Sequence, residues 1–148
     1  MELPDFLIHA GSLSLGLAAN VFTGIFRPHL QVQQFPNLVE RETKLFGILA
    51  NIVRARIRRD EVFARYGGEE FAIILPETSL EGAVALAETL RQKVGEHLFV
   101  FQADAIRVTI SIGAALLQES DRAATELIKR ADEKLYVAKN SGRNRVCS

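Results

Sequence analysis

Two adjacent glycines followed by two adjacent glutamates, Gly67-Gly68-Glu69-Glu70, form the segment of this sequence that is best suited to chemistry. Glycine has no side chain, so the phosphate or sugar of a ligand can approach its backbone closely. A carboxylate on a rigid turn can bind Mg²⁺, which neutralises phosphate charge during phosphoryl transfer. The same four residues also fit an ordinary solvated turn, so alone they leave both interpretations open.

A second candidate is the basic run at the end of the last predicted helix, residues 139–145. Its Lys139 and Arg143 are four residues apart across a helix end. Arginine binds phosphate with a planar fork and lysine with a point charge, so the pair suits a triphosphate. The run also fits a helix cap, because basic residues offset the negative end of the helix dipole and Gly142 would close the helix.

Four arginines and two acidic residues lie together further upstream: Arg54, Arg56, Arg58, Arg59, Asp60 and Glu61. The structural interpretation is that they form the polar face of a helix. One of the arginines would still suit an anionic ligand. The three histidines and the one cysteine lack the spacing of metal ligands, so we expect no zinc site from His9, His29, His97 and Cys147.

The hydrophobic pattern becomes regular from Lys44 onward and predicts the elements that hold these residues. The Gly-Gly step predicts a β-hairpin in which the glycines supply positive φ. Thr78 with Glu81 predicts a capping box, and Gly113 predicts a bulge or a close backbone approach within a strand. In order, we expect a helix over 44–57, strands over 62–66 and 71–75, a helix over 80–94, a strand over 108–117, a helix over 123–140 and a short strand over 145–147. This order indicates an α/β fold, an α+β sandwich with helices packed on a mixed, mainly antiparallel sheet.

The N-terminal part, residues 1–43, resists assignment. Residues 6–26 carry no formal charge and as a helix would just span a bilayer. If they do, Arg27 places the rest of the chain at the inner, cytoplasmic face of the membrane. Polar residues weaken that interpretation, and the alternative is a buried strand and helix. Residues 27–43 show neither a helical nor a strand period.

The composition excludes several classes of protein. Eighteen basic and eighteen acidic side chains give a net charge of zero, so no global field attracts nucleic acid. The single cysteine, Cys147, cannot form an intrachain disulfide, which favours a reducing cytoplasm. A chain of 148 residues is long enough for one compact domain.

Three segments resemble, in order and spacing, the motifs of the GGDEF domain of bacterial diguanylate cyclases. They are residues 64–71 (ARYGGEEF) followed by Leu75-Pro76, residues 108–113 (VTISIG), and residues 131–136 (ADEKLY) together with 139–145. The resemblance covers residues 44–148 and includes the Glu variant of the signature. It implies a fold similar to nucleotide cyclases and the palm of polymerases.

The resemblance also implies a reaction. In GGDEF cyclases each of two protomers holds one GTP, and each 3′-hydroxyl attacks the other α-phosphate to give cyclic di-GMP, so a homodimer is required. Glu69 would be a ligand of Mg²⁺ or Mn²⁺ that also favours deprotonation of the hydroxyl, with Glu70 beside it. Gly67 and Gly68 would give the nucleotide access to the backbone, while Lys139 and Arg143 would hold the triphosphate.

The resemblance ends upstream of Lys44. An ungapped comparison places Phe26 where the family has its other metal ligand, an aspartate, and places Gln34 and Thr43 where it has the guanine-binding Asn and Asp. The family's product-inhibition motif, Arg-x-x-Asp, falls on Arg58 to Glu61, with Glu for Asp. Three hypotheses follow: a diguanylate cyclase domain with an incomplete metal site, a non-catalytic GGDEF module that binds nucleotide or a partner protein in signalling, or a purely structural fragment.

Overall fold

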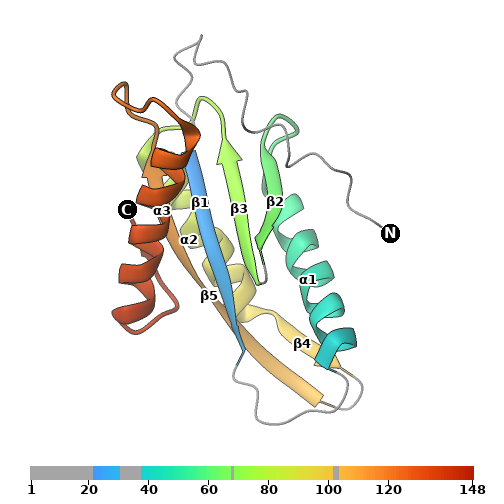
Figure 1. Cartoon of the computed structure of the whole chain (residues 1–148). Helices are drawn as coiled ribbons and strands as arrows, with labels where there is room; N and C mark the ends of the chain where they lie inside the picture. The colour runs from blue at the N-terminus through green and yellow to red at the C-terminus, as the bar shows by residue number, and fades with distance from the viewer. Residues whose placement is uncertain (1–21, 31–37, 68, 102–103) are drawn as a thin grey trace.

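A computed structural model describes residues 22–30, 38–67, 69–101 and 104–148 of the chain. These residues form a six-stranded sheet with three helices packed on it. Figure 1 shows their arrangement. The elements, in order, are β1 (Phe22–Leu30), α1 (Leu38–Arg54), β2 (Val62–Gly67), β3 (Glu70–Leu75), α2 (Leu80–Glu96), β4 (Leu98–Phe101), β5 (Asp104–Leu116), α3 (Ala124–Asn140) and β6 (Val146–Cys147). The α/β class predicted from the sequence is therefore confirmed.

The sheet has the order β2-β3-β1-β5-β4, and β6 also pairs with β5. All neighbouring strands are antiparallel except β5 and β6. β1 is thus a central strand, and its Phe26 lies opposite Phe71 of β3 and Ile112 of β5. Residues 22–26 of the uncharged N-terminal stretch belong to this strand, whereas residues 6–21 lie outside the described residues.

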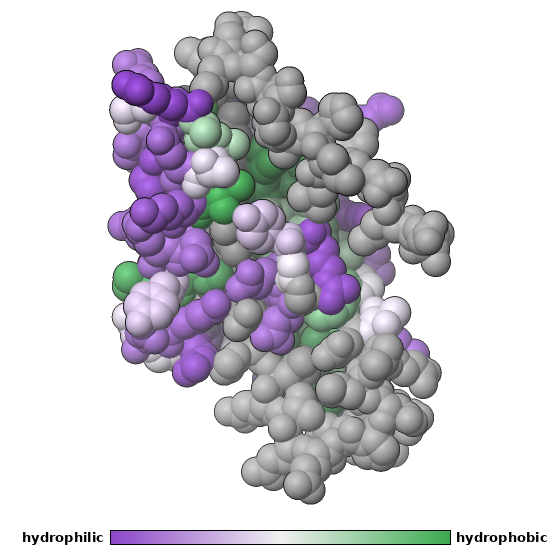
Figure 2. Space-filling view, viewed as in Figure 1, coloured by the Kyte–Doolittle hydropathy of each residue, from purple (hydrophilic) through white to green (hydrophobic). Residues whose placement is uncertain are grey.

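Helices cover both faces of the sheet, and β5 contributes buried residues to both. Successive strand residues point to opposite faces. Val108, Ile110 and Ile112 of β5 join the core formed with α1 and α2. Ala115 joins a second cluster with α3. In Figure 2, hydrophilic residues dominate the side of the molecule where α3 lies.

Within the described ranges, none of the helices is long and apolar enough to cross a membrane.

Gly113 of β5 allows α3 to lie directly against the sheet. A Cβ at this position would overlap the Ala131 carbonyl oxygen and the Leu135 backbone of α3. Leu135 and Ala131 are themselves fully buried. The close backbone approach predicted for Gly113 is therefore confirmed, and it fixes the height of α3 above β5.

The structure corrects several local predictions. α1 starts at Leu38, earlier than the hydrophobic pattern suggested. The N-cap of α2 is Ser79 rather than Thr78, because the Ser79 hydroxyl accepts from the Gly82 amide at 3.1 Å. Thr78 instead accepts a hydrogen bond from Arg58. The strand β4, of only four residues, was not predicted from the sequence.

Candidate functional site

The β2–β3 hairpin is anchored next to its turn by packed aromatic side chains. The two strands pair antiparallel from Val62 to Gly67, with a register irregularity just before Gly67. Phe71, the second residue of β3, is buried and packs against Phe63 and Phe46 with ring centroids 5.5 and 5.3 Å apart. The base of the turn is therefore held by the core.

The signature glutamates follow one another at this turn. Glu69 is exposed in the turn, and Glu70 is the half-buried first residue of β3. Gly68 lies outside the described residues. The signature thus spans the end of β2, the turn and the start of β3.

Gly67 differs from its predicted role. The φ angle of Gly67 is not positive, so the expectation that it supplies a left-handed turn conformation is wrong. A Cβ built on Gly67 would meet no atom within 4 Å. Neither the backbone conformation nor the packing of the described residues requires glycine here. The absent side chain leaves open space beside the turn.

Lys139 meets the hairpin from the last turn of α3. Its Nζ lies 3.9 Å from Oε1 of Glu70, and the two side chains are 24% and 27% exposed. This distance is too long for a hydrogen bond and describes a loose ion pair. The structure therefore brings together the hairpin and the end of α3, although the two residues lie far apart in the sequence.

Arg143 lies in a left-handed loop that follows α3. Gly142, Arg143 and Asn144 have φ angles of 108°, 61° and 46°. The Ser141 amide donates to Val137 and the Arg143 amide to Ala138, at 2.9 and 3.0 Å, so these bonds close the helix end. The cap interpretation is correct for this segment, and it leaves the side chain of Arg143 exposed.

Among the described residues, no further metal-ligating side chains group with the carboxylates of the hairpin. Mg²⁺ demands near-octahedral oxygen coordination. In the register of the sheet Phe26 lies beside Phe71, so β1 brings a phenylalanine to the position where the resemblance implies an aspartate. Across the part of the chain that the structure describes, no three His, Cys, Asp or Glu residues are grouped to hold a metal ion. Of the guanine-binding positions, Gln34 lies outside the described residues and Thr43 is exposed on α1.

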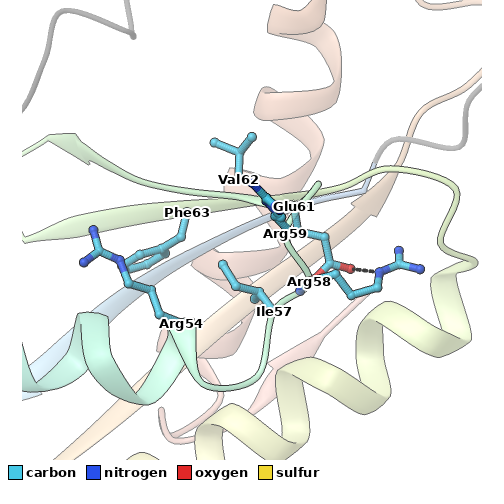
Figure 3. A pocket seen from close by; sticks show the side chains of 7 residues that line it. All are labelled: Arg54, Ile57, Arg58, Arg59, Glu61, Val62 and Phe63. Atoms are coloured by element: carbon cyan, nitrogen blue, oxygen red, sulfur yellow. Dashed lines mark hydrogen bonds and ion pairs between the residues drawn. The ribbon is translucent and has the colours of Figure 1, made fainter.

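Arg58 and Glu61 lie at the opposite end of the same hairpin and are bound to each other. Arg58 Nε donates to Glu61 at 2.8 Å, and its Nη2 donates to the Pro76 carbonyl and the Thr78 hydroxyl at 3.0 Å each. The hydrogen bond that Arg58 donates to Glu61 is the main cause that raises the pKa of Arg58. Figure 3 shows the pair beside an open pocket of about 570 Å³, which is lined by Arg54, Ile57, Arg58, Arg59, Glu61, Val62 and Phe63.

Comparison with known proteins identifies the family. The family model described as "Diguanylate cyclase, GGDEF domain" matches residues 43–145. The chain belongs to the GGDEF family of diguanylate cyclase domains. Diguanylate cyclase A of Treponema denticola is 41% identical to this GGDEF chain over 98 residues, which are 66% of the chain and 26% of that protein. The chain thus spans about a quarter of the length of this curated relative.

Solved structures agree with the GGDEF fold. The active GGEEF domain of a diguanylate cyclase from Vibrio cholerae superposes with a TM-score of 0.73 at 30% identity, over 86% of this chain and 81% of that one. The GGDEF domain of FimX from Pseudomonas aeruginosa superposes with a TM-score of 0.79, over 96% of this chain and 88% of that one. Its 24% identity supports the fold alone.

The residues that hold the loop after α3 were not predicted from the sequence. The Asn144 amide donates to the hydroxyl of Ser111 at 3.1 Å, and the Asn144 side-chain oxygen accepts from Arg91 at 3.0 Å. A partial signal was present, because Asn tolerates the left-handed conformation that often follows a helix. Nothing in the sequence pairs Asn144 with Arg91 of α2 or Ser111 of β5.

Proposed function

We propose that this GGDEF domain binds GTP at the hairpin turn and is of the diguanylate cyclase type. Two protomers, each holding one GTP, would join them into cyclic di-GMP with release of two pyrophosphates. The observation that supports this best is the position of Lys139, 3.9 Å from Glu70 of the signature. A cation and a carboxylate from separate elements meet where the resemblance implies the triphosphate.

The loose pairing of Lys139 suits a phosphate-binding role. An ion pair at 3.9 Å between partly exposed groups contributes little stability. A triphosphate offers the ammonium group shorter, charge-assisted hydrogen bonds. Replacing the Glu70 contact of Lys139 by phosphate therefore favours binding of the ligand. Arg143 adds an exposed guanidinium on the loop that starts directly after the same helix.

The open space at Gly67 supports nucleotide approach to the backbone. Since neither backbone conformation nor internal packing of the described residues demands glycine there, a requirement for glycine would come from a bound molecule. A nucleotide that lies against the turn is such a molecule. Glu69, exposed on the same turn, would face its reacting end.

The second candidate is a GGDEF module that binds GTP without turning it over. Phe26 favours this candidate, because β1 has a phenylalanine at the position where the resemblance implies a second metal-binding carboxylate. Phenylalanine offers no oxygen ligand. Glu69 would remain as the one metal ligand that the resemblance implies. We therefore expect weak affinity for Mg²⁺ or Mn²⁺ in either case.

The two candidates are separated by incubating the purified protein with GTP and Mg²⁺ at high protein concentration. Formation of cyclic di-GMP, detected by chromatography, supports the cyclase. In that case Glu69→Gln should abolish the product, and the rate per protomer should rise with protein concentration because each site holds half of the reacting pair. GTP binding by calorimetry without any product supports the signalling module.

Two outcomes would contradict the proposal. Product formation that survives Glu69→Gln would show that the site lies elsewhere. Absence of both GTP binding and product would remove the nucleotide site altogether. Glu81→Gln is a matched control, because Glu81 is an exposed glutamate in the first turn of α2.

A further inference from the structure

Three consecutive residues after α3 have left-handed backbone conformations, and two of them are not glycine. Gly142 adopts this conformation freely, but Arg143 and Asn144 do so at φ angles of 61° and 46°. The left-handed region is unfavourable for residues with a Cβ, although Asn tolerates it better than most. A strained segment of this kind persists only where its surroundings hold it in place.

Asn144 connects this segment to two other elements. Its backbone amide donates to Oγ of Ser111 at 3.1 Å, and Ser111 is a buried polar residue of β5, 2% exposed. Its side-chain oxygen accepts from the guanidinium of Arg91 at 3.0 Å, and Arg91 lies on α2. One residue thus joins the loop to the sheet and to a helix on the opposite face.

Arg91 and the strand residue after Ser111 make further hydrogen bonds. The Arg91 guanidinium is fixed by Glu88, whose carboxylate accepts from its Nε at 2.7 Å. Directly after Ser111, the Ile112 amide donates to the carbonyl of Arg145 at 2.9 Å, which fixes the far side of the loop. Arg143 lies between these anchors and the end of α3.

We propose that Asn144, through Ser111 and Arg91, is a positioning residue that holds the backbone of Arg143 left-handed and so aims its guanidinium at the triphosphate of GTP. This inference deepens the proposed function and rests on it for the identity of the ligand. Asn144 itself need not touch the nucleotide. Asn144 fixes the backbone of Arg143 before GTP binds, so less conformational entropy is lost on binding.

The first test measures the loop without any ligand. Amide hydrogen exchange, resolved by NMR, should show a protected Asn144 amide in the wild-type protein. Ser111→Ala removes the acceptor, so exchange at Asn144 should become at least about tenfold faster while the amides of α2 keep their rates. An unchanged exchange rate at Asn144 in Ser111→Ala would overturn the proposed contact.

The second test is a double-mutant cycle on GTP affinity, measured by calorimetry with Mg²⁺. Arg143→Ala and Asn144→Ala should each weaken binding by about tenfold. The double variant should bind no more weakly than Arg143→Ala, because Asn144 acts only through that arginine. Losses that add in full would overturn the positioning role, since Asn144 would then act independently of Arg143.

Two further variants separate positioning from general damage to the fold. Asn144→Asp keeps an acceptor for Arg91 and tolerates the left-handed conformation, so its affinity should stay within about threefold of wild type. An Asp variant as weak as Asn144→Ala would count against the inference. Asn51→Ala, at an exposed position of α1, is the matched control and should bind normally.

The failures of the two proposals are distinguishable. Wild-type protein that binds no GTP overturns the proposed function and the triphosphate role of Arg143 together. The exchange data still decide whether Asn144 holds the loop, because they need no ligand. Normal GTP binding with unchanged exchange in Ser111→Ala overturns the positioning device alone.

Discussion

The two ends of the β2–β3 hairpin hold their charged groups in opposite ways. At the turn, Glu70 faces Lys139 across 3.9 Å and makes a loose pair. At the open end, the Arg58 side chain donates three hydrogen bonds of 3.0 Å or less, to Glu61, Pro76 and Thr78. The Glu61 side chain there is 5% exposed and that of Arg58 is 56% exposed, whereas both partners at the turn are about a quarter exposed.

This difference separates a site that can accept an anion from one that is already satisfied. An anion that binds Lys139 replaces its 3.9 Å contact with Glu70. A ligand at the open end has to replace hydrogen bonds that fasten the loop before β2 to the loop after β3. We therefore expect nucleotide binding at the turn to depend on α3. We expect the main role of Arg58 to be structural, linking the loop before β2 to the loop after β3.

The largest effect should come from moving α3 away from the turn. Gly113→Ala places a Cβ against the backbone of Ala131 and Leu135, so α3 must shift. We expect a loss of about 3 kcal/mol, which lowers Tm by roughly 10 °C in a domain of this size. Thermal unfolding by circular dichroism measures it. Gly47→Ala is the matched control, because a Cβ there meets nothing within 4 Å and should slightly raise Tm. Equal Tm values for the two variants would refute the close approach.

The next effect concerns the other end of α3, which is held by an ion pair. Arg130 Nη1 donates to Asp121 at 2.6 Å, and the Arg130 guanidinium also donates to the Leu116 carbonyl at 2.9 Å. The hydrogen bond from Arg130 holds the pKa of the 3% exposed Asp121 carboxyl below its usual range. Asp121→Asn should cost about 2 kcal/mol at neutral pH, less than a fully buried pair because Arg130 is partly exposed.

The pH dependence of stability tests that pair directly. Because the folded pKa of Asp121 is depressed, its contribution is present above the unfolded value of about 4 and is lost as pH falls through the lower folded value. Urea unfolding between about pH 6 and pH 2 should show this loss in wild type and a flatter profile in Asp121→Asn. Profiles of equal slope would show that the carboxylate contributes nothing through ionisation.

A smaller effect contrasts the two ends of the hairpin in one assay. Lys139→Ala should weaken GTP binding by about tenfold, because one charge-assisted contact with phosphate is lost. Arg58→Ala should leave GTP affinity unchanged and lower the free energy of unfolding, because three side-chain hydrogen bonds are lost. Calorimetry and urea unfolding measure the two quantities on the same samples. If Arg58→Ala weakens GTP binding as much as Lys139→Ala does, the two ends of the hairpin do not differ in the way proposed.

The sequence was informative where a motif and its element coincide. The hairpin, α2, α3 and Gly113 follow from apolar periods and from glycine, whose effects are local. The Glu70–Lys139 pair rested on the family resemblance, because no local rule brings the end of α3 to a turn some 70 residues earlier.

The failures have two physical causes. Single-residue capping choices, such as Ser79 over Thr78, depend on a tertiary partner, here Arg58, that the local pattern does not contain. The short β4 and the early start of α1 have too few periodic residues for a pattern to show. The three-way junction of Asn144, Ser111 and Arg91 joins elements that only the fold places side by side.

The smallest effect should appear at the open end, where the comparison can be sharpened by loosening Arg58. Thr78→Val removes one of its three side-chain hydrogen bonds while keeping a β-branched side chain of similar size. If cyclic di-GMP binds at Arg58, as the family motif implies, release of this bond should tighten its binding by about two- to threefold. Calorimetry with cyclic di-GMP measures the change. Ser79→Ala is the matched control, because it removes the adjacent N-cap of α2 and leaves the bonds of Arg58 in place. Equal affinities in Thr78→Val and wild type would mean that Arg58 keeps its hydrogen bonds to the Pro76 carbonyl and Glu61 when cyclic di-GMP is present. The role of this end of the hairpin would then be structural.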